Sequence, residues 1–503
     1  MTDAKHGETI QGLMSYGHWI AGRETHSGGA SFPSHNPTTG AEWGRFALGS
    51  QDTVGDAVAA ATAAFEGAEW SSLSPTRRGR LMMRWGDAIA QHAEKLGALE
   101  TSQNGKLLSE MVLQARIVPD WLYYYGGLAD KIEGRVIPVE RRSVLNYTRR
   151  EALGVVGVIM PWNSPLFLTT MAVAPALAAG NTVVIKPSEV SSASIIEAVK
   201  LAEQIGFPRG VLNVVTGGRE TAEALIDHCG VAKIAFTGGV EAGRAVGVRA
   251  ARRMAQVTLE LGGKSANIVF PDADLAQARA GLLAGIFAAA GQTCVAGSRA
   301  FVHRSIHDRL LAELAERAKN IRIGNPLDPA TQMGPVATKA QLDKDESMVR
   351  RAIDEGAQVV HGGCRAAVDG FPGGYFYTPT ILTGVSPGSY IAQNEVFGPV
   401  LSVIPFDDED EVIALANGTG FGLAAGIWSL NIRQAHRVAN QLQAGTVWVN
   451  MYRAMSFNSP FGGYKASGIG RQNGIEAIDS YLQTKSIWCE LSQEVQDPFV
   501  MRA

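Results

Sequence analysis

Short apolar runs alternate with segments of helical periodicity between residues 153 and 270, and this alternation constrains the fold more than any other feature of the chain. The apolar runs are Gly154–Met160, Thr182–Ile185, Val211–Val215, Lys233–Phe236 and Gln256–Leu259. Ser191–Ile205 and Arg219–His228 lie between them and are predicted to be helices. Because strands that are apolar along their whole length are buried on both faces, the pattern predicts a parallel sheet with helices on each side.

A second alternating block follows the first. Its predicted elements are a strand at Ala266–Phe270, a strand at Ala300–Val302, a helix at 304–320 and a strand at Gly445–Val449. Helical periodicity is also present at 55–66 and 76–98. A chain of 503 residues exceeds one ordinary core and favours two to four domains. We therefore expect an α/β fold with more than one domain.

Two segments stand apart from these blocks. Gly134–Arg150 is typical of a polar hairpin with its turn near Glu140–Ser143. Gln483–Leu491 is predicted to be a strand with Ile487, Cys489 and Leu491 on one side. Strands outside a sheet leave backbone groups unpaired. We expect these segments to pair with a second subunit, and a hairpin packed on its own domain is the alternative.

Composition excludes several classes of protein. The chain is 46% hydrophobic and 18% charged, as in globular proteins, and its formal charge of −3 gives no basis for binding nucleic acid. Its four cysteines form no CxxC pair and no cluster at metal-ligand spacing, so we expect neither disulfides nor a metal. The N-terminus lacks the apolar stretch of a signal peptide, and no apolar run reaches the roughly 20 residues of a membrane span. We expect no membrane partner and a cytoplasmic location, where thiols stay reduced.

Two local sequences predict covalent chemistry. Cys294 lies in Gly291-Gln-Thr-Cys-Val-Ala-Gly, where glycine and small polar residues leave room for a ligand. Glu260 lies between two leucines in Val257-Thr-Leu-Glu-Leu-Gly-Gly-Lys, where desolvating a carboxylate is costly. Together they indicate a thiol nucleophile and a nearby base.

A third sequence, Met160-Pro-Trp-Asn-Ser-Pro165, ends the first apolar run. The amide of Asn163 can donate to an oxyanion formed when the thiol attacks a carbonyl, a contribution of about 3 kcal/mol. The alternative is that Asn163 only caps a helix beginning near Leu166.

Two further segments indicate a dinucleotide. Phe236-Thr-Gly-Gly-Val-Glu-Ala-Gly243 follows a predicted strand and opens a predicted helix, so its glycines allow a phosphate to approach a helix N-terminus. It is not a GxGxxG motif, and a plain strand–helix turn is the alternative. In Val184-Ile-Lys-Pro-Ser-Glu189, the carboxylate of Glu189 can accept from ribose hydroxyls and Lys186 can reach ribose or phosphate oxygens. A salt-bridged surface pair is the alternative there.

Several separate motifs, in order along nearly the whole chain, resemble those of the NAD(P)-dependent aldehyde dehydrogenases. They are Pro161-Trp-Asn163, Lys186-x-x-Glu189, Phe236-Thr-Gly238, Leu259-Glu-Leu-Gly-Gly-Lys264, Gly291-Gln-Thr-Cys294, Asn394-Glu-Val-Phe-Gly-Pro399 and Pro460-Phe-Gly-Gly-Tyr-Lys-Ala-Ser-Gly468. The resemblance implies a Rossmann-like cofactor domain (1–129 and 149–262), an α/β catalytic domain (263–478) and a β oligomerisation arm (130–148 and 479–503). It also implies a homodimer or homotetramer.

The resemblance implies a reaction and its residues. An aldehyde is oxidised to the acid through a thiohemiacetal and a thioester on Cys294, with Glu260 as the base that activates water. Asn163 and the Cys294 amide form the oxyanion hole. The implied cofactor contacts are Met160, Pro161, Trp162, Lys186, Ser188, Glu189, Gly218, Phe236, Thr237, Gly238, Gly239, Leu261, Glu395 and Phe397. The implied substrate pocket is Leu166, Leu168, Met171, Thr293, Val295, Arg453, Met455 and Phe457.

Cofactor and substrate follow from the same residues. Glu189 favours the 2′-hydroxyl of NAD over the 2′-phosphate of NADP, which remains the alternative. Apolar Met and Phe side chains in the pocket favour a hydrophobic or aromatic aldehyde. Arg453 instead suits an anionic semialdehyde, or is a solvated surface residue.

Two positions depart from the family pattern. Gly239 replaces a frequent serine, which removes a side-chain contact to the pyrophosphate. Met171-Ala172 replaces a frequent Trp-Lys, which puts a proton-relay lysine in doubt. Three alternatives stay open: a coenzyme A-acylating relative, which Glu260 disfavours; a non-catalytic relative; and a cysteine hydrolase, which would need a histidine partner absent from the motifs.

Overall fold

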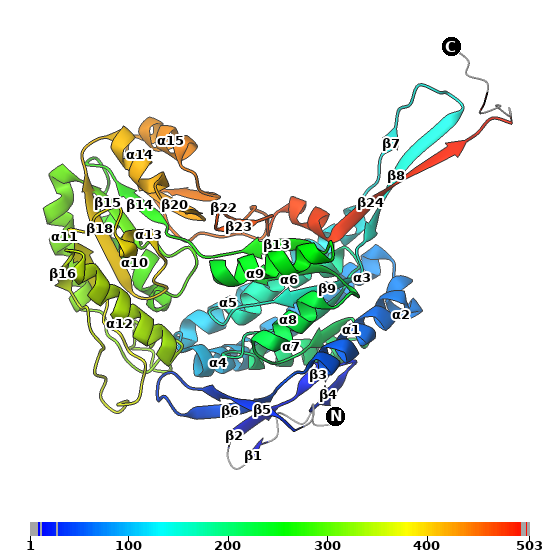
Figure 1. Ribbon diagram of the computed structural model, residues 1–503, viewed down its shortest axis with the longest axis horizontal. Helices are drawn as coiled ribbons and strands as arrows, with labels where there is room; N and C mark the ends of the chain where they lie inside the picture. The colour runs from blue at the N-terminus through cyan, green and yellow to red at the C-terminus, as the bar shows by residue number, and fades with distance from the viewer. Residues whose placement is uncertain (1–8, 11–12, 27–28, 494–498, 500–503) are drawn as a thin grey trace.

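The computed structural model describes residues 9–10, 13–26, 29–493 and 499. Two bodies of sheet and helix lie side by side, and a narrow three-stranded sheet projects from one of them (Figure 1). The fold is mixed α/β with parallel sheets, as the sequence predicts. In the described part of the chain, no helix is both long and apolar enough to cross a membrane.

The five apolar runs between residues 153 and 270 are the parallel centre of one eight-stranded sheet, which confirms the prediction. In spatial order they are β13 (Gln256–Glu260), β12 (Val231–Thr237), β9 (Val155–Ile159), β10 (Thr182–Lys186) and β11 (Leu212–Val214). Antiparallel strands from distant parts of the chain complete both edges: β3 (His18–Ile20) and β4 (Arg23–Thr25) at one, and β23 (Gly468–Ile469) at the other. The sequence prediction did not include these edge strands.

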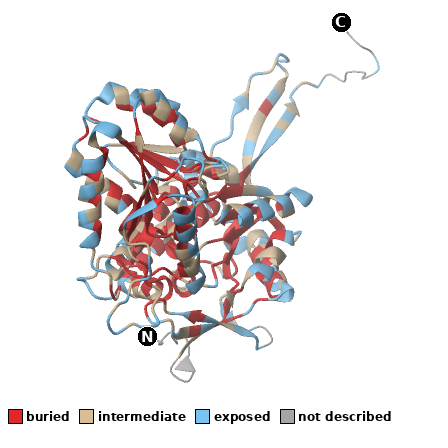
Figure 2. Cartoon of the chain, turned by 60° about the vertical axis from the view of Figure 1, so that its left-hand side comes forward, coloured by how far each residue is buried: buried red, intermediate tan, exposed pale blue. Residues whose placement is uncertain are grey.

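Helices cover both faces of this sheet. Apolar side chains of α1 (Gln51–Glu66), α8 (Arg219–Asp227) and α9 (Val240–Arg252) pack on one face. On the other lie α6 (Pro165–Ala178), α7 (Ala193–Gln204) and the helices α3 (Pro75–Gln91), α4 (Ala93–Asn104) and α5 (Leu108–Leu128). The buried residues gather between these layers (Figure 2). Burying both faces accounts for the absence of apolar–polar alternation in the strands.

The helical periodicity at 76–98 is confirmed, but the segment is not one continuous helix. It is two helices, α3 and α4, with the break at His92, whose φ of −108° and ψ of 13° are not helical. The break lets α4 pack closely on α5, where a Cβ on Gly97 would lie 2.7 Å from the nitrogen of Val112. A single period of 3.6 residues runs through both helices, so periodicity alone does not reveal the bend.

The second block forms a seven-stranded sheet that is parallel except for its first strand. In spatial order its strands are β16 (Gln358–His361), β17 (Thr380–Thr383), β18 (Val400–Phe406), β15 (Arg299–His303), β14 (Ala266–Val269), β20 (Ala424–Trp428) and β21 (Thr446–Val449). Its helices are α10 (Leu275–Phe287), α11 (Arg304–Lys319), α12 (Lys339–Asp354), α13 (Tyr390–Gln393), α14 (Glu409–Asn417) and α15 (Ile432–Gln441). The predicted strands and the helix at 304–320 are confirmed.

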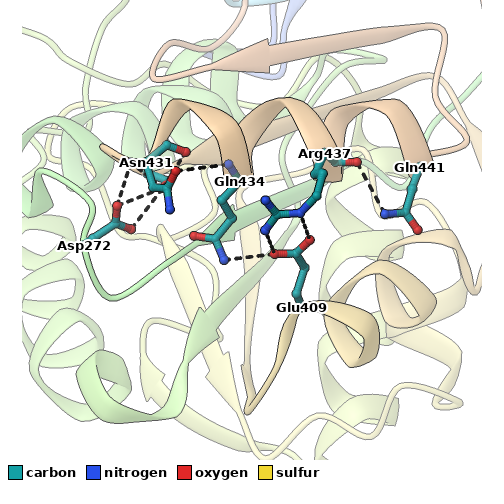
Figure 3. Close-up of polar contacts among 7 residues, drawn as sticks. Asp272, Glu409, Asn431, Gln434, Arg437 and Gln441 are labelled. Carbon is teal, nitrogen blue, oxygen red and sulfur yellow. Dashed lines mark hydrogen bonds and ion pairs between the residues drawn. The ribbon is translucent and has the colours of Figure 1, made fainter.

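Polar contacts fix α15 to its neighbours (Figure 3). Asn431 caps the helix by accepting from the Gln434 N–H at 3.2 Å, and its own N–H donates to Asp272 at 2.7 Å. Farther along, Arg437 forms a two-bonded ion pair with Glu409, which begins α14. These contacts hold α15 against α14 and against the turn that follows β14.

The projecting sheet consists of β7 (Val136–Ile137), β8 (Val144–Ala152) and β24 (Leu482–Glu490). The predicted hairpin and late strand therefore pair with each other within one chain. Ile487 and Cys489 are half-buried, whereas Trp488 between them is 64% exposed and Leu491, beyond the strand, is 65% exposed. Apolar side chains thus stand open to solvent on this sheet.

The remaining elements are small. A separate four-stranded sheet contains β1 (Thr9–Ile10), β2 (Leu13–Tyr16), β6 (Glu42–Ala47) and β5 (Ser31–His35). β19 (Phe421–Gly422) pairs with β22 (Tyr464–Lys465). The short helices are α2 (Ala68–Ser71), η1 (Ala129–Lys131), η2 (Ala288–Gly291) and η3 (Ile475–Tyr481).

Candidate active site

Most of the candidate residues follow the carboxyl ends of the parallel strands of the first sheet. Asn163 follows β9, Lys186 ends β10 and Glu189 follows it, Gly238 follows β12, and Glu260 ends β13. Because these ends share one edge of the sheet, residues far apart in sequence meet there, which is the usual place for ligands in open α/β sheets.

Cys294 comes to this edge from the second block, on a strained turn. Ala289, Ala290 and Gly291 all have left-handed backbones, with φ of 56°, 50° and 74°. For an alanine this conformation costs roughly 1–2 kcal/mol. Gln292 holds the turn: its side chain donates to the Ala289 carbonyl at 3.2 Å and accepts from the Ala337 N–H at 2.8 Å. The turn leaves the thiol half-buried in a cavity.

Burial controls the ionisation of this thiol. It raises the pKa of Cys294 to about 12, and the nearby carboxyl groups of Glu395 and Glu260 add to the effect. The thiol is therefore protonated at neutral pH in the chain by itself. A base or a positive charge in the cavity has to favour the thiolate before Cys294 can attack.

Glu260 is a buried carboxyl group without a protein partner. It is 3% exposed, and neither carboxyl oxygen makes a hydrogen bond within the described chain. Burial raises its pKa well above 4.5, against a smaller opposite effect of Arg471. A buried oxygen without a partner is rare and costly, and is typical of a group whose partner is a water or a ligand.

Asn163 does not cap the helix that follows it, so the capping alternative is wrong. The helix α6 begins at Pro165, and its N-cap residue is Ser164. The Asn163 side chain instead donates to the main-chain carbonyl of Gln292 at 3.0 Å. This bond ties the loop after β9 to the loop that carries Cys294.

The three residues line one cavity with an empty volume of about 710 Å³. Its other predicted members are Pro161, Trp162, Leu168, Thr237, Gly238, Gly239, Leu261, Glu395 and Phe397. Gly262, Gln341 and Lys344 also line it and were not predicted. Gln341 donates to the carbonyl of Val396, between Glu395 and Phe397, at 2.9 Å. The chain has no local signal for this contact, because Gln341 lies on a helix 55 residues away.

A larger cavity, with an empty volume of about 1340 Å³, adjoins the first. Both are lined by Pro161, Trp162, Thr237 and Gly238. The predicted residues that line the larger cavity also include Met160, Lys186, Ser188, Glu189 and Phe236. Arg219 and Arg249 line it as well and were not predicted. The two cavities together form an extended cleft along the strand ends.

The residues of this cleft fit a dinucleotide. The N-cap of α9 is Gly239, which supplies no side-chain bond to the first N–H groups of the helix, so these are available to a phosphate. Lys186 lies 3.3 Å from Glu189, whose side chain is 54% exposed. At the other end the rings of Trp162 and Phe397 meet edge to face, with centroids 5.5 Å apart. Glu395 accepts from the Gly263 N–H at 3.0 Å.

Other predicted residues lie outside both cavities. Gly218 begins α8 and lines a neighbouring cavity with Ser50, Asp52 and Asp56. Leu166 and Met171 are buried in α6, and Met171 is 0% exposed, so it packs in the core. Thr293, Val295, Arg453, Met455 and Phe457 do not line either cavity.

Arg453 is engaged by its own chain. It has a left-handed backbone, with φ of 66°. Its guanidinium donates to the Ala284 carbonyl at 3.2 Å and lies 3.7 Å from a carboxyl oxygen of Glu110. The carboxylate offsets part of its charge.

An aromatic cluster surrounds Phe457. Its ring centroid lies 5.9 Å from that of Trp121 and 5.1 Å from that of Tyr124, and Phe167 lies 4.9 Å from Trp121. Cys294 and this group pack against the same hydrophobic core. Sequence reasoning found only Phe457, because the other three rings come from α5 and α6.

The described residues contain no group of three or more His, Cys, Asp or Glu side chains placed to hold a metal ion.

The chain is similar to many known proteins. Residues 23–487 match the model of the aldehyde dehydrogenase family. A (Z)-2-((N-methylformamido)methylene)-5-hydroxybutyrolactone dehydrogenase of Acinetobacter baylyi is 46% identical, over 94% of this chain and 97% of the relative. A betaine aldehyde dehydrogenase of Brucella anthropi is 43% identical, over 94% of this chain and 96% of the relative.

Solved structures agree. An NAD+ complex of an aldehyde dehydrogenase from Bacillus cereus has a TM-score of 0.93 and 40% identity, covering 95% of this chain and 97% of the other. A betaine aldehyde dehydrogenase from Staphylococcus aureus in complex with NAD+ has a TM-score of 0.94 and 37% identity, covering 97% of each chain.

Proposed function

The chain belongs to the aldehyde dehydrogenase family, and we propose that it oxidises an aldehyde to the free acid with Cys294 as nucleophile, Glu260 as base and Asn163 as oxyanion donor. The observation that carries this assignment is the shared cavity, in which a half-buried thiol, a buried carboxyl group without a partner among the described residues and a side-chain amide meet. The three come from separate parts of the chain, and no structural need explains their meeting.

The first half of the reaction forms a bond between carbon and sulfur. The Cys294 thiol first gives its proton to a base in the cavity. The thiolate then adds to the aldehyde carbon, and the carbonyl oxygen becomes an oxyanion that accepts from the Asn163 amide and the Cys294 N–H. Loss of hydride from the same carbon then leaves a thioester. NAD supplies the hydride acceptor when it is bound.

The second half releases the product. Glu260 takes a proton from a water molecule, which attacks the thioester carbon and displaces the Cys294 thiolate. Burial raises the pKa of Glu260, and this suits the role because its carboxylate is then a stronger base than an exposed one. A hydrolytic outcome is supported over transfer to coenzyme A because Glu260 is present.

NAD is the cofactor of the solved relatives, and the cleft supports the same cofactor here. Glu189 can accept from the 2′-hydroxyl of the adenosine ribose, and Lys186 beside it can donate to the 3′-oxygen. Glu395, which lines the cavity with Phe397, would accept from the nicotinamide ribose. The charged side chains that line the larger cavity include three cations and three carboxylates, namely Lys186, Arg219, Arg249, Glu189, Glu223 and Glu241. Such a balance supports a preference for NAD without excluding NADP.

The substrate is a hydrophobic or aromatic aldehyde in this proposal. Trp121, Phe167 and Phe457 pack against the same hydrophobic core as Cys294, and this apolar, aromatic surrounding supports such a substrate. The pairing of Arg453 with Glu110 disfavours a substrate held by a free guanidinium. Rings also attract quaternary ammonium groups, and relatives of this chain are named for betaine aldehyde, so that cation is the second candidate.

A kcat/KM survey tests these points together. Aromatic, aliphatic, acidic and trimethylammonium aldehydes are compared with NAD and with NADP, and NADH or NADPH formation is followed. We expect the highest kcat/KM with an aromatic aldehyde and NAD. Absence of reduced cofactor with every aldehyde would overturn the function, and a preference for the acidic aldehydes would overturn only the substrate class.

The projecting sheet supports a homodimer or homotetramer, because exposed side chains such as Trp488 and Val136 would be covered by a second subunit. Sedimentation analysis of the intact chain tests this. A cytoplasmic location completes the proposal, because reducing conditions keep Cys294 available.

A further inference from the structure

Three buried polar residues at the end of α4 and just beyond it contact the loop that carries Asn163. They are Glu100, Asn104 and Lys106, each no more than 2% exposed. The side chain of Asn104 donates to the main-chain carbonyl of Trp162 at 3.3 Å. The ammonium of Lys106 donates to the hydroxyl of Ser164 at 3.2 Å. The two bonds therefore reach the residues immediately before and after Asn163.

The turn that presents these side chains is tightly determined. Asn104 and Lys106 are joined by a third bond, in which the Lys106 N–H donates to the Asn104 side-chain oxygen at 3.0 Å. Gly105 between them has a φ of 75°, and a Cβ there would lie 2.7 Å from a ring carbon of Pro335. Only glycine adopts this backbone at low cost in so little space. The backbone of the turn at Asn104–Lys106 is therefore fixed by its own contacts, apart from those it makes with the Asn163 loop.

Glu100 extends the same contact into α6. One of its carboxyl oxygens accepts from the Leu166 N–H at 2.9 Å and from the Ser194 hydroxyl at 2.8 Å. The start of α6 is therefore held as well. Altogether the loop from Trp162 to Leu166 receives three contacts from α4 and the turn after it.

Burying an ammonium group costs several kcal/mol unless other groups compensate. Lys106 has only partial compensation. Its nearest carboxyl oxygen, on Glu110, lies 3.9 Å away and is shared with Arg453 at 3.7 Å. Burial accordingly lowers the pKa of Lys106, although Glu110 opposes that shift. A hydrophobic residue would fill this space at lower cost, so the fold alone gives no reason for a lysine.

We propose that Asn104 and Lys106 are positioning residues for the oxyanion amide, and that they fix the main chain on both sides of Asn163. The inference rests on the proposed role of Asn163. Among the described residues the Asn163 side chain makes a single hydrogen bond, to Gln292, and Asn163 lines the cavity together with Cys294. The direction in which the Asn163 amide points therefore depends on the backbone of its own loop. A misplacement of about 1 Å at such a donor reduces the rate by roughly 100-fold.

The variants Asn104→Ala and Lys106→Met test this, and the chain offers a matched control. Gln103 precedes Asn104 on the same helix and is also 0% exposed. Its amide bonds to Ser34 and to the Ala193 N–H, away from the Asn163 loop. Gln103→Ala therefore removes comparable buried hydrogen bonds without releasing Asn163. Thermal unfolding of all three variants measures the purely structural loss.

We expect kcat with aldehyde and NAD to fall about 10- to 100-fold in Asn104→Ala and Lys106→Met, with KM within about threefold of the wild type. Gln103→Ala should keep kcat within about threefold. In an Asn163→Ala background, adding either substitution should cost less than about threefold more, because the group they position is gone.

Three results would overturn the inference. One is an unchanged kcat in both variants. Another is an equal loss in Gln103→Ala. The third is the same fold-loss with and without Asn163. If Lys106→Met does not fold, Ser164→Ala removes only the acceptor of its bond and is judged by the same criteria. A wild-type chain that reduces no NAD would instead overturn the proposed function, so the two failures are distinct.

Discussion

The Nδ2 atom of Asn163 lies 3.0 Å from the main-chain oxygen of Gln292, two residues before Cys294. This bond joins a loop of the first sheet to a loop of the second block. The bond therefore contributes directly to the distance between the candidate oxyanion donor and the candidate nucleophile. The strained turn at Ala289 and Ala290 is kept in place partly by this contact.

Replacing Glu260 by Gln should separate the two halves of the reaction. The amide cannot take a proton from water, so the thioester accumulates. We expect one rapid equivalent of NADH per active site, followed by a steady rate at least about 100-fold below that of the wild type. Rapid mixing with mass analysis of the acylated chain measures both. Undiminished steady turnover would contradict the role of Glu260.

The same substitution should stabilise the fold in alkaline solution. Burial raises the pKa of Glu260 in the folded chain well above its ordinary value of 4.5. At pH values between 4.5 and the folded pKa, the Glu260 carboxyl group is therefore ionised in the unfolded chain and protonated in the folded chain. The wild type therefore loses stability as pH rises through this window, and Glu260→Gln does not. The Tm difference in favour of the variant should grow as the pH rises above 4.5. A difference that shrinks with rising pH would refute the shift.

Alkylation of Cys294 should report its raised pKa. With a pKa of about 12, the thiolate fraction in the cofactor-free chain rises about tenfold per pH unit through the neutral and mildly alkaline range. Iodoacetamide labelling of the Cys294 peptide, followed by mass spectrometry, should rise in parallel. The exposed Cys364 serves as the internal control. Levelling off near pH 9.0, the ordinary thiol value, would show that burial has no such effect.

Glu189→Gln should shift cofactor choice. Its carboxylate, 54% exposed beside Lys186, repels the 2′-phosphate of NADP. Removing that charge should raise the ratio of kcat/KM for NADP over NAD by about tenfold or more, which corresponds to about 1.4 kcal/mol. Glu241→Gln, which lines the same cavity on α9, is the control. Equal ratios in Glu189→Gln and the wild type would remove Glu189 as the determinant.

Arg453→Ala tests whether the guanidinium of Arg453 attracts negatively charged aldehydes to the site. Because Glu110 offsets part of the guanidinium charge, we expect kcat/KM for acidic and neutral aldehydes to change by the same factor, within about threefold. The measurement is the ratio of the two kcat/KM values in the variant and the wild type. A selective loss of at least about tenfold with acidic aldehydes would show that Arg453 recognises them.

The sequence predicted the sheets well because their signal is local. Apolar runs such as Thr182–Ile185 and glycine-rich turns such as the one at Gly238 can be identified within a few residues. The break at His92 was not predictable, since it depends on how α4 meets α5. The edge strands β3 and β23 were missed for a similar reason: each is short, and its partner lies far away in sequence.

The residues of the candidate site also divide into those with a local sequence signal and those without one. Cys294, Glu260 and Asn163 stand in distinctive local sequences, and all three line one cavity. Gln341, Trp121 and Lys106 have no such sequence signal, because each acts through a contact made only in the folded chain. Arg453 was weighed as a free charge, and its proximity to Glu110 could not be inferred from the residues around it.

The pairing of β13 with β23 has a consequence for the newborn chain. Glu260 ends a strand whose outer neighbour, Gly468–Ile469, leaves the ribosome long after it. At about 5–20 residues per second, the roughly 200 intervening residues take on the order of 10–40 s to synthesise. Throughout that interval the strand edge beside Glu260 lacks its partner.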